Sequence, residues 1–202
     1  MSNEIYTVGH SIHAIEMFIS LLTQHRITVV CDVRSSPYSR INPQFNRESL
    51  KQSLSKHAIG YLFLGEELGA RSKNPACYVD GKARYELIAK TKLFADGIER
   101  LKDEMTTHSV ALMCAEREPL NCHRTILVGR ALVGQGFSVQ HILDDGSLEG
   151  HEQTLSRLLH RLGLPEGDLF QSRNDCIEAA YEIESERMSY EGASDLAVAP
   201  PK

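Results

Sequence analysis

The densest group of reactive side chains in this sequence lies between residues 114 and 124. The segment reads CAEREPLNCHR and holds two thiols, two carboxylates, two guanidiniums and an imidazole. An apolar run over residues 109–113 precedes it and an amphipathic run over residues 125–135 follows it. These runs predict a strand-to-helix turn, which is where α/β folds build their sites. We therefore expect an active or binding site here.

Each reactive group in this segment suggests a role. The free amides of a helix's first turn favour an anion, and Arg124 could reinforce that preference as an anion clamp. Glu116 could act as a general acid or base, and His123 could carry a proton or contact the substrate. Cys122, close to a helix N-terminus and beside two cationic side chains, is expected to have a lowered pKa and is a candidate nucleophile.

The same residues also allow simpler interpretations. Cysteine is often buried for packing alone, and Glu116 and Arg124 could pair with each other. A metal could be held by Cys114, Cys122 and His123, but their spacing matches none of the standard zinc patterns. The prediction is therefore of a site without a metal, with this ligand set as the alternative.

Polar motifs also follow the other predicted strands, at ends that a parallel sheet would place on one edge. His10 is a candidate proton carrier, and Ser11 could cap the next helix or contact the substrate. Asp32 could orient His10 or a substrate hydroxyl while Arg34 holds an anion, although these two side chains could equally form a salt bridge. Gly65 would let the backbone approach a ligand, or would simply form a turn.

Alternating patterns along the chain predict the elements that position these residues. Strands are expected over residues 5–8, 28–33, 61–64, 109–113 and 139–143. Helices are expected over residues 12–25, 47–57, 83–105, 125–134 and 151–162. Right-handed crossovers would then cover both faces of the sheet. We predict an α/β fold, a Rossmann-like three-layer sandwich with a mostly parallel sheet of about five strands.

Composition favours a single domain with an extension. The 202 residues are 42% hydrophobic and 24% charged, which suits one α/β domain over residues 1–162. Residues 163–202 carry 9 of the 27 acidic and 3 of the 22 basic residues. This acidic extension is expected to be helical over residues 174–188 and flexible beyond, as a solvated or oligomer-packing segment. Five irregularly spaced cysteines predict no disulfide framework, and Cys31, Cys77 and Cys176 are expected to be structural.

Several classes of protein are disfavoured. The chain has neither a Walker loop nor a dinucleotide fingerprint, and its Cys and Arg positions do not fit a cysteine phosphatase loop. Neither a membrane span nor a signal peptide is evident, so a cytoplasmic location without membrane partners is expected. The cofactor and the oligomeric state stay open.

The middle of the chain is the basic part. Residues 34–92 contain 11 Lys or Arg against 5 Asp or Glu, so this region could face phosphate or nucleic acid, or could be an ordinary solvated surface. Aromatic residues of this region, such as Tyr38, Phe45, Tyr61 and Phe63, could stack on bases or belong to the core.

Four motifs in order carry a resemblance to a known family. TVGHS at residues 7–11, DVRSSP at 32–37, LGEELG at 64–69 and the CAE…CHR segment together resemble the family called domain of unknown function 488. The resemblance covers roughly residues 4–160, and Ala70, where glycine is expected, is the main departure. It implies a compact α/β domain that gathers these motifs at one site, and it brings no settled activity.

Three functions follow from these observations. The first is an enzyme, a hydrolase or transferase, acting on an anionic partner such as a phosphorylated small molecule, nucleotide or nucleic acid. The second is a non-catalytic ligand, metal or redox sensor that uses Cys114 and Cys122. The third is a nucleic-acid-binding module, whose affinity would fall steeply with added salt.

Overall fold

A six-stranded sheet forms the centre of the computed structural model, which describes residues 3–167 and 171–190. The strand order is β3-β2-β6-β1-β7-β8; the first five strands run parallel, and β8 pairs antiparallel with β7. The strands are β1 (Glu4–Gly9), β2 (Val29–Asp32), β3 (Gly60–Phe63), β6 (Val110–Cys114), β7 (Ser138–Ile142) and β8 (Leu148–Gly150). The predicted mostly parallel sheet is confirmed, with β8 as an edge strand that the sequence patterns did not predict.

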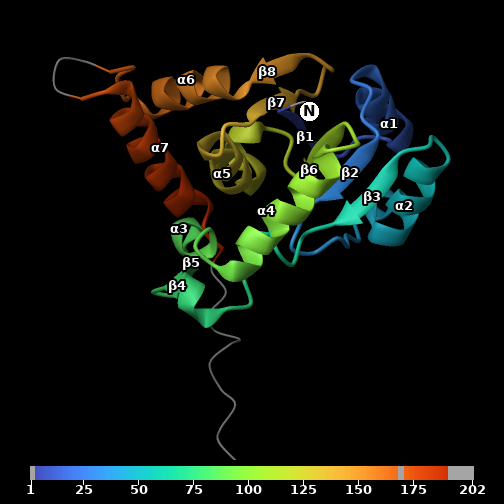
Figure 1. Ribbon diagram of the computed structural model, residues 1–202, viewed down its shortest axis with the longest axis horizontal. Coiled ribbons are helices and arrows are strands. Elements are labelled where there is room, and N and C mark those ends of the chain that lie inside the picture. The colour runs from blue at the N-terminus through green and yellow to red at the C-terminus, as the bar shows by residue number, and fades with distance from the viewer. Residues whose placement is uncertain (1–2, 168–170, 191–202) are drawn as a thin grey trace, which may run out of the picture.

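Helices cover both faces of this sheet (Figure 1). One face packs against α1 (Ile15–Gln24) and α2 (Arg47–Ser55). The other packs against α4 (Lys92–Met105), α5 (Arg130–Gly134) and α6 (His151–Leu162). The predicted three-layer α/β sandwich is therefore confirmed.

Strand β6 shows why the sheet sits between two apolar cores. All five of its side chains are buried, as expected for a parallel strand covered on both faces. Val110, Leu112 and Cys114 join the core beneath α4, whereas Ala111 and Met113 join the core beneath α1. This alternation, which follows from the two-residue period of a strand, aims Cys114 at the α4 side.

Several predicted helices differ from the structure in their limits. The helix expected over residues 83–105 is two helices, α3 (Tyr85–Ile88) and α4, because the Thr91 hydroxyl accepts from the Phe94 amide and starts α4 as a new helix. The helix expected from residue 12 begins at Ile15. Short segments not predicted are β4 (Tyr78–Val79), β5 (Lys82–Ala83), η1 (Pro43–Phe45), η2 (Pro75–Cys77) and η3 (Pro119–Asn121).

The acidic extension forms the predicted helix, α7 (Arg173–Met188), which packs on the domain itself. Its side chains Cys176, Ile177, Ala180 and Tyr181 are buried in the core on the α4 side. Three of its acidic residues pair with arginines of the domain; Glu184, for example, lies 2.9 Å from Arg161. The extension is thus an integral part of this face and not a solvated appendage. The flexibility predicted for the chain end falls largely on residues 191–202, outside the described residues.

The structure also tests the predictions on disulfides and membrane spans. All five cysteines are buried free thiols in the structure. Cys31, Cys77 and Cys176 belong to the core, as expected for structural residues. Within the described ranges, no helix combines the length and apolar character needed to cross a bilayer.

Candidate functional site

A cavity of about 420 Å³ opens beyond the ends of β2 and β6. Its lining mixes basic, hydroxyl, acidic and imidazole groups, which are Arg34, Ser35, Ser36, Arg71, Glu116, Asn121 and His123. Cys114, Ala115, Ala70 and Tyr85 also line it, and Met188, Ser189 and Tyr190 contribute from the end of α7. The predicted carboxyl-end location of the site therefore coincides with a real cavity.

The reactive loop leaves β6 and returns to the same place. Cys114 ends the strand, Glu116 follows in the loop, and the short turn η3 brings the chain back to Cys122 and His123. The next six residues, η4 (Arg124–Gly129), form a π-helical turn and not the predicted α-helical start. Such wide turns occur often at functional sites, and this one follows directly after the two returning side chains.

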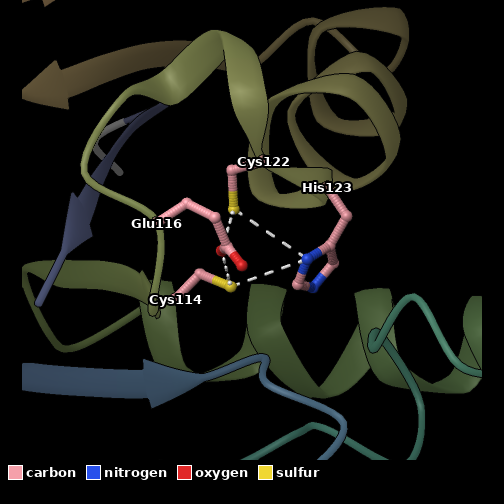
Figure 2. Close-up of side chains that lie close together, drawn as sticks. All are labelled: Cys114, Glu116, Cys122 and His123. Carbon is pink, nitrogen blue, oxygen red and sulfur yellow. Dashed lines mark hydrogen bonds between the residues drawn. The ribbon is translucent and has the colours of Figure 1, made fainter. Parts of the chain in front are cut away.

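Four side chains of this loop point toward one another, namely Cys114, Glu116, Cys122 and His123 (Figure 2). The sulfur atoms of Cys114 and Cys122 lie 2.8 and 3.0 Å from Oε2 of Glu116. They lie 3.6 and 3.9 Å from Nδ1 of His123. The structure thus gathers Glu116, Cys122, His123 and the alternative metal ligand Cys114 in one cluster at the base of the cavity.

The pKa values of the Cys114 and Cys122 thiols are shifted in opposite directions. Burial and a hydrogen bond with Cys122 raise the pKa of the Cys114 thiol well above its ordinary value. Burial also opposes ionisation of Cys122, but the hydrogen bond with Cys114 and the charge of Arg124 outweigh it and hold the pKa of Cys122 well below its ordinary value. Of the two thiols, Cys122 is therefore the one whose surroundings favour ionisation.

The pKa values of Glu116 and His123, the two groups of the cluster that could transfer a proton, are both raised. Burial, together with the neighbouring Cys122, raises the pKa of Glu116. For His123, burial lowers the pKa, but the contact with Cys122 more than offsets it, so the pKa is raised. Glu116 consequently holds its proton closer to neutral pH than an ordinary glutamate does.

Arg124 has a different position from the predicted anion clamp. Its side chain is fully buried, and it is absent from the lining of the cavity. Its guanidinium donates to the carbonyl oxygens of Glu116 at 2.5 Å and Arg117 at 3.1 Å. Arg124 therefore fixes the loop that carries Glu116 and supplies positive charge beside Cys122.

Arg34, Asp32 and His10 form a second group that borders the cavity through Arg34 alone. Nε of Arg34 donates to one carboxylate oxygen of Asp32 at 2.9 Å and Nη2 donates to the other at 2.6 Å. Nη1 of Arg34 donates to Nε2 of His10 at 3.0 Å, and the His10 ring stacks on Phe45. Burial and the Arg34 charge lower the pKa of His10 to about 4. Asp32 thus forms the salt bridge with Arg34 that the sequence left as the alternative, and both His10 and Asp32 lie outside the lining of the cavity, where they position Arg34.

Ser11 and Gly65 also lie outside the lining of the main cavity. Helix α1 begins at Ile15 with Ala14 at its N-cap, so Ser11 does not form the predicted cap. A Cβ on Gly65 would lie 1.9 Å from the carbonyl oxygen of Arg34, which explains why glycine is needed where these two loops touch. Gly65 lines a smaller neighbouring cavity of about 220 Å³, which shares Ser35 and Arg71 with the main one.

Replacing Asp32 with asparagine is expected to destabilise the protein by about 3–5 kcal/mol, because the buried Arg34 charge loses its partner. Urea unfolding followed by circular dichroism measures this change. Glu66→Gln is the matched control, since it breaks an exposed pair with Lys73 and should cost less than about 1 kcal/mol. Equal effects of the two substitutions would contradict the positioning role of Asp32.

Sequence reasoning missed the walls of the cavity farthest from the motifs. Arg71 lies in a loop without a recognisable pattern, and its guanidinium stacks on Tyr190, 4.3 Å from the ring centroid. Tyr190 is held in turn by its carbonyl oxygen, which accepts from the Ala83 amide at 3.0 Å. No local signal marks these residues, because the packing of α7 brings Tyr190 to the site and a bond from the Arg71 amide to the Ser35 hydroxyl holds Arg71 there.

The cluster of Cys114, Glu116, Cys122 and His123 has the composition of a metal site. Each residue offers one ligand atom, and these atoms all lie within 4.8 Å of one another. Glu116 is the exposed member, whereas the other three are buried. The arrangement can therefore serve proton transfer, thiolate chemistry or metal binding.

Comparison with known proteins gives a family without an activity. The family model described as "Domain of unknown function DUF488" matches residues 14–131, which include the whole reactive loop. Neither a curated protein nor a solved structure matches the chain significantly.

Proposed function

This chain belongs to the DUF488 family, whose description assigns no activity, and we propose that it is an enzyme that hydrolyses or transfers a group of an anionic substrate bound in the cavity beside Glu116. The observation that carries the proposal is the shared lining of this cavity. Basic and hydroxyl groups suited to an anion lie in the same cavity as two groups suited to proton transfer.

Arg34 and Arg71 supply the positive charge of the proposed anion site. Arg34 is held rigidly by Asp32, and Arg71 is held by its stacking on Tyr190 and by the bond from its amide to the Ser35 hydroxyl at 3.0 Å. Preorganised cations of this kind bind phosphate or carboxylate groups without first having to be ordered. The hydroxyls of Ser35 and Ser36 add uncharged donors for the same oxygens.

Glu116 is the proposed general acid or base. The residue is the exposed member of the cluster and lines the cavity, but its carboxyl group lies against the two buried sulfur atoms, and this desolvation raises its pKa, which favours proton exchange near neutral pH. Cys122 is less suited to direct attack, because it is only 1% exposed and does not line the cavity. The same burial argues against a redox sensor, which needs sulfur atoms that an oxidant can reach.

A nucleotide or nucleic acid is the proposed substrate class. The neighbouring cavity that shares Ser35 and Arg71 adds Arg47 and Lys73, together with the exposed ring of Tyr38. Cations interleaved with an aromatic ring are typical of surfaces that bind phosphates and stack bases. Four of the 11 basic residues in the region 34–92 thus line the two adjoining cavities.

The proposal predicts that Glu116→Gln lowers the turnover number by about 10²–10⁴-fold, because the substitution removes proton transfer and keeps the shape of the side chain. The assay incubates the protein with nucleoside mono-, di- and triphosphates, short DNA and RNA single strands and p-nitrophenyl phosphate. Mass spectrometry of the products identifies any reaction. The substrate that reacts is then used to compare variants.

Glu118→Gln is the matched control for this experiment. Glu118 lies in the same loop, pairs with Arg157 and does not line the main cavity, so its substitution should leave turnover close to that of the unmodified protein. Arg71→Met should instead raise KM. Absence of reaction with every substrate, or equal turnover in Glu116→Gln and Glu118→Gln, would refute the proposal.

A further inference from the structure

Two sulfur atoms and an imidazole nitrogen converge at the base of the cavity, on a point that a small cation could occupy. From this geometry we infer that Cys114, Cys122 and His123 bind a zinc ion, with Glu116 at the corner that faces the cavity. The inference rests on the proposed function, in that it gives the same site a metal. It concerns a ligand set whose spacing along the chain matches no standard zinc pattern, so the fold alone creates it.

The two sulfur–nitrogen distances among the buried ligand atoms fit a tetrahedral ion. Zinc–sulfur and zinc–nitrogen bonds of about 2.3 and 2.0–2.1 Å, meeting at a tetrahedral angle, separate sulfur from nitrogen by about 3.5 Å. The sulfur atoms of Cys114 and Cys122 lie 3.6 and 3.9 Å from Nδ1 of His123. Shifts of a few tenths of an ångström in the side chains would bring these two distances to the value expected for tetrahedral zinc.

The hydrogen bond on the far side of His123 favours metal binding at Nδ1. Its Nε2 lies 2.9 Å from the carbonyl oxygen of Val33, which can only accept, so Nε2 must donate. Metal-binding histidines nearly always donate their second nitrogen in this way, which fixes the ring and its tautomer. Nδ1 is then the nitrogen that faces the two sulfur atoms (Figure 2).

The surrounding charge favours an anionic ligand set. Arg124 is fully buried and makes no ion pair with a carboxylate among the residues that the structure describes. A buried charge without a counterion is costly, so Arg124 favours negative charge on nearby ligands such as Cys122, whose sulfur also accepts from the backbone amide of Arg124 at 3.4 Å. Sulfur and imidazole ligands select zinc over magnesium or calcium, which prefer oxygen.

Glu116 lies at the fourth corner of the proposed site but is not one of the three permanent zinc ligands. Its Oε2 lies 2.8 and 3.0 Å from the two sulfur atoms, closer than the separation of about 3.5 Å expected between two ligands of one zinc ion. It must therefore move outward when the ion binds, and its exposure on the cavity side permits this. Three protein ligands and one open corner are typical of catalytic zinc sites.

The test measures metal content without any substrate. The full chain is purified, and native mass spectrometry and elemental analysis are expected to find one zinc ion per molecule. Cobalt titration of the metal-free protein is expected to give the absorption bands of thiolate-bound cobalt. Cys114→Ser, Cys122→Ser and His123→Gln should each weaken zinc binding by more than about 100-fold, since loss of an outer partner alone costs about 10–100-fold.

Cys31→Ser is the matched control, because Cys31 is also a buried free thiol but lies outside the cluster; it should bind zinc as the unmodified protein does. Glu116→Gln should keep its zinc. If the cysteine variants do not fold, the cobalt titration of the unmodified protein decides the matter. Absence of both zinc and cobalt–thiolate bands, or another metal in place of zinc, would overturn the inference.

The remaining outcomes are also decisive. Equal zinc affinity in Cys122→Ser and Cys31→Ser would overturn the ligand assignment, and loss of zinc in Glu116→Gln would overturn the open corner. A protein that binds zinc but turns over no substrate would refute the proposed enzyme and leave the zinc site standing. Turnover that depends on Glu116 in a protein that binds no zinc would refute the zinc site and support the proposed enzyme.

Discussion

Gly9→Ala is expected to destabilise the protein by about 3–6 kcal/mol and to dismantle the reactive loop. Gly9 ends β1 opposite Cys114, and a Cβ at this position would lie 1.9 Å from the carbonyl oxygen of Glu116. The loop must therefore move away from the sheet. That carbonyl is also an acceptor for the buried guanidinium of Arg124, so the displacement breaks a second interaction.

Urea unfolding and zinc titration measure the two parts of this effect. The control is Gly134→Ala, since a Cβ on Gly134 meets no atom within 4 Å and alanine favours the helix that this residue ends. The control should unfold at the same or a higher urea concentration. If Gly9→Ala unfolds at the same urea concentration as Gly134→Ala and keeps its zinc affinity, the loop is not fixed by contact with β1.

Acidification from about pH 6.5 to about pH 4 is expected to remove a large part of the stability, because three histidines are buried in the neutral form. Burial lowers the pKa of His151 to about 4, as it does for His10, and it lowers the pKa of His141 as well. His141 and His151 face each other at 3.1 Å in a buried chain that runs from Thr7 to Tyr181.

The sign of the effect follows from proton uptake. The unfolded chain protonates these histidines near pH 6.5, whereas folded His10 and His151 do so near pH 4. Between these values the unfolded state binds more protons, so stability falls as the pH falls. The difference between 6.5 and about 4 corresponds to about 3 kcal/mol for each of these two residues. His123, whose pKa is raised, acts in the opposite direction and offsets part of the loss.

Urea unfolding at pH values between 7.5 and 4.5 tests this prediction. The free energy of unfolding should decrease over this range, and His151→Gln should reduce the slope because one of the groups is removed. His57→Gln, at an exposed position, should leave the slope unchanged. A free energy of unfolding that stays constant between pH 7 and pH 5 would contradict the prediction.

The sequence predicted the fold and the reactive loop because both depend on local patterns. Apolar runs defined the five parallel strands, and parallel strands must bring their carboxyl ends to one edge. Glu116, Cys122 and His123 lie within nine residues of the end of β6, so their convergence needed only a loop that returns. Strand β8 escaped prediction, since its three residues give too little alternation to recognise.

Sequence could not decide which loop residues face the cavity. His10 and Asp32 follow their strands just as Glu116 does, yet both turn toward Arg34 and away from the cavity. The direction depends on partners far along the chain, such as Phe45 beneath His10 and Tyr61, whose hydroxyl donates to Asp32 at 2.8 Å. Arg124 likewise reads as an anion clamp until its burial is known.

The end of α7 has a consequence for how relatives diverge. Met188, Ser189 and Tyr190 close one side of the cavity, and they lie outside residues 14–131, the segment that the family shares. If the proposed function holds, relatives with the same sulfur- and carboxylate-bearing loop can differ in the ligand they prefer through changes in their C-terminal segment, with the proposed reacting groups unchanged. Exchanging α7 between two relatives should therefore exchange their ligand preference and leave the type of reaction unchanged.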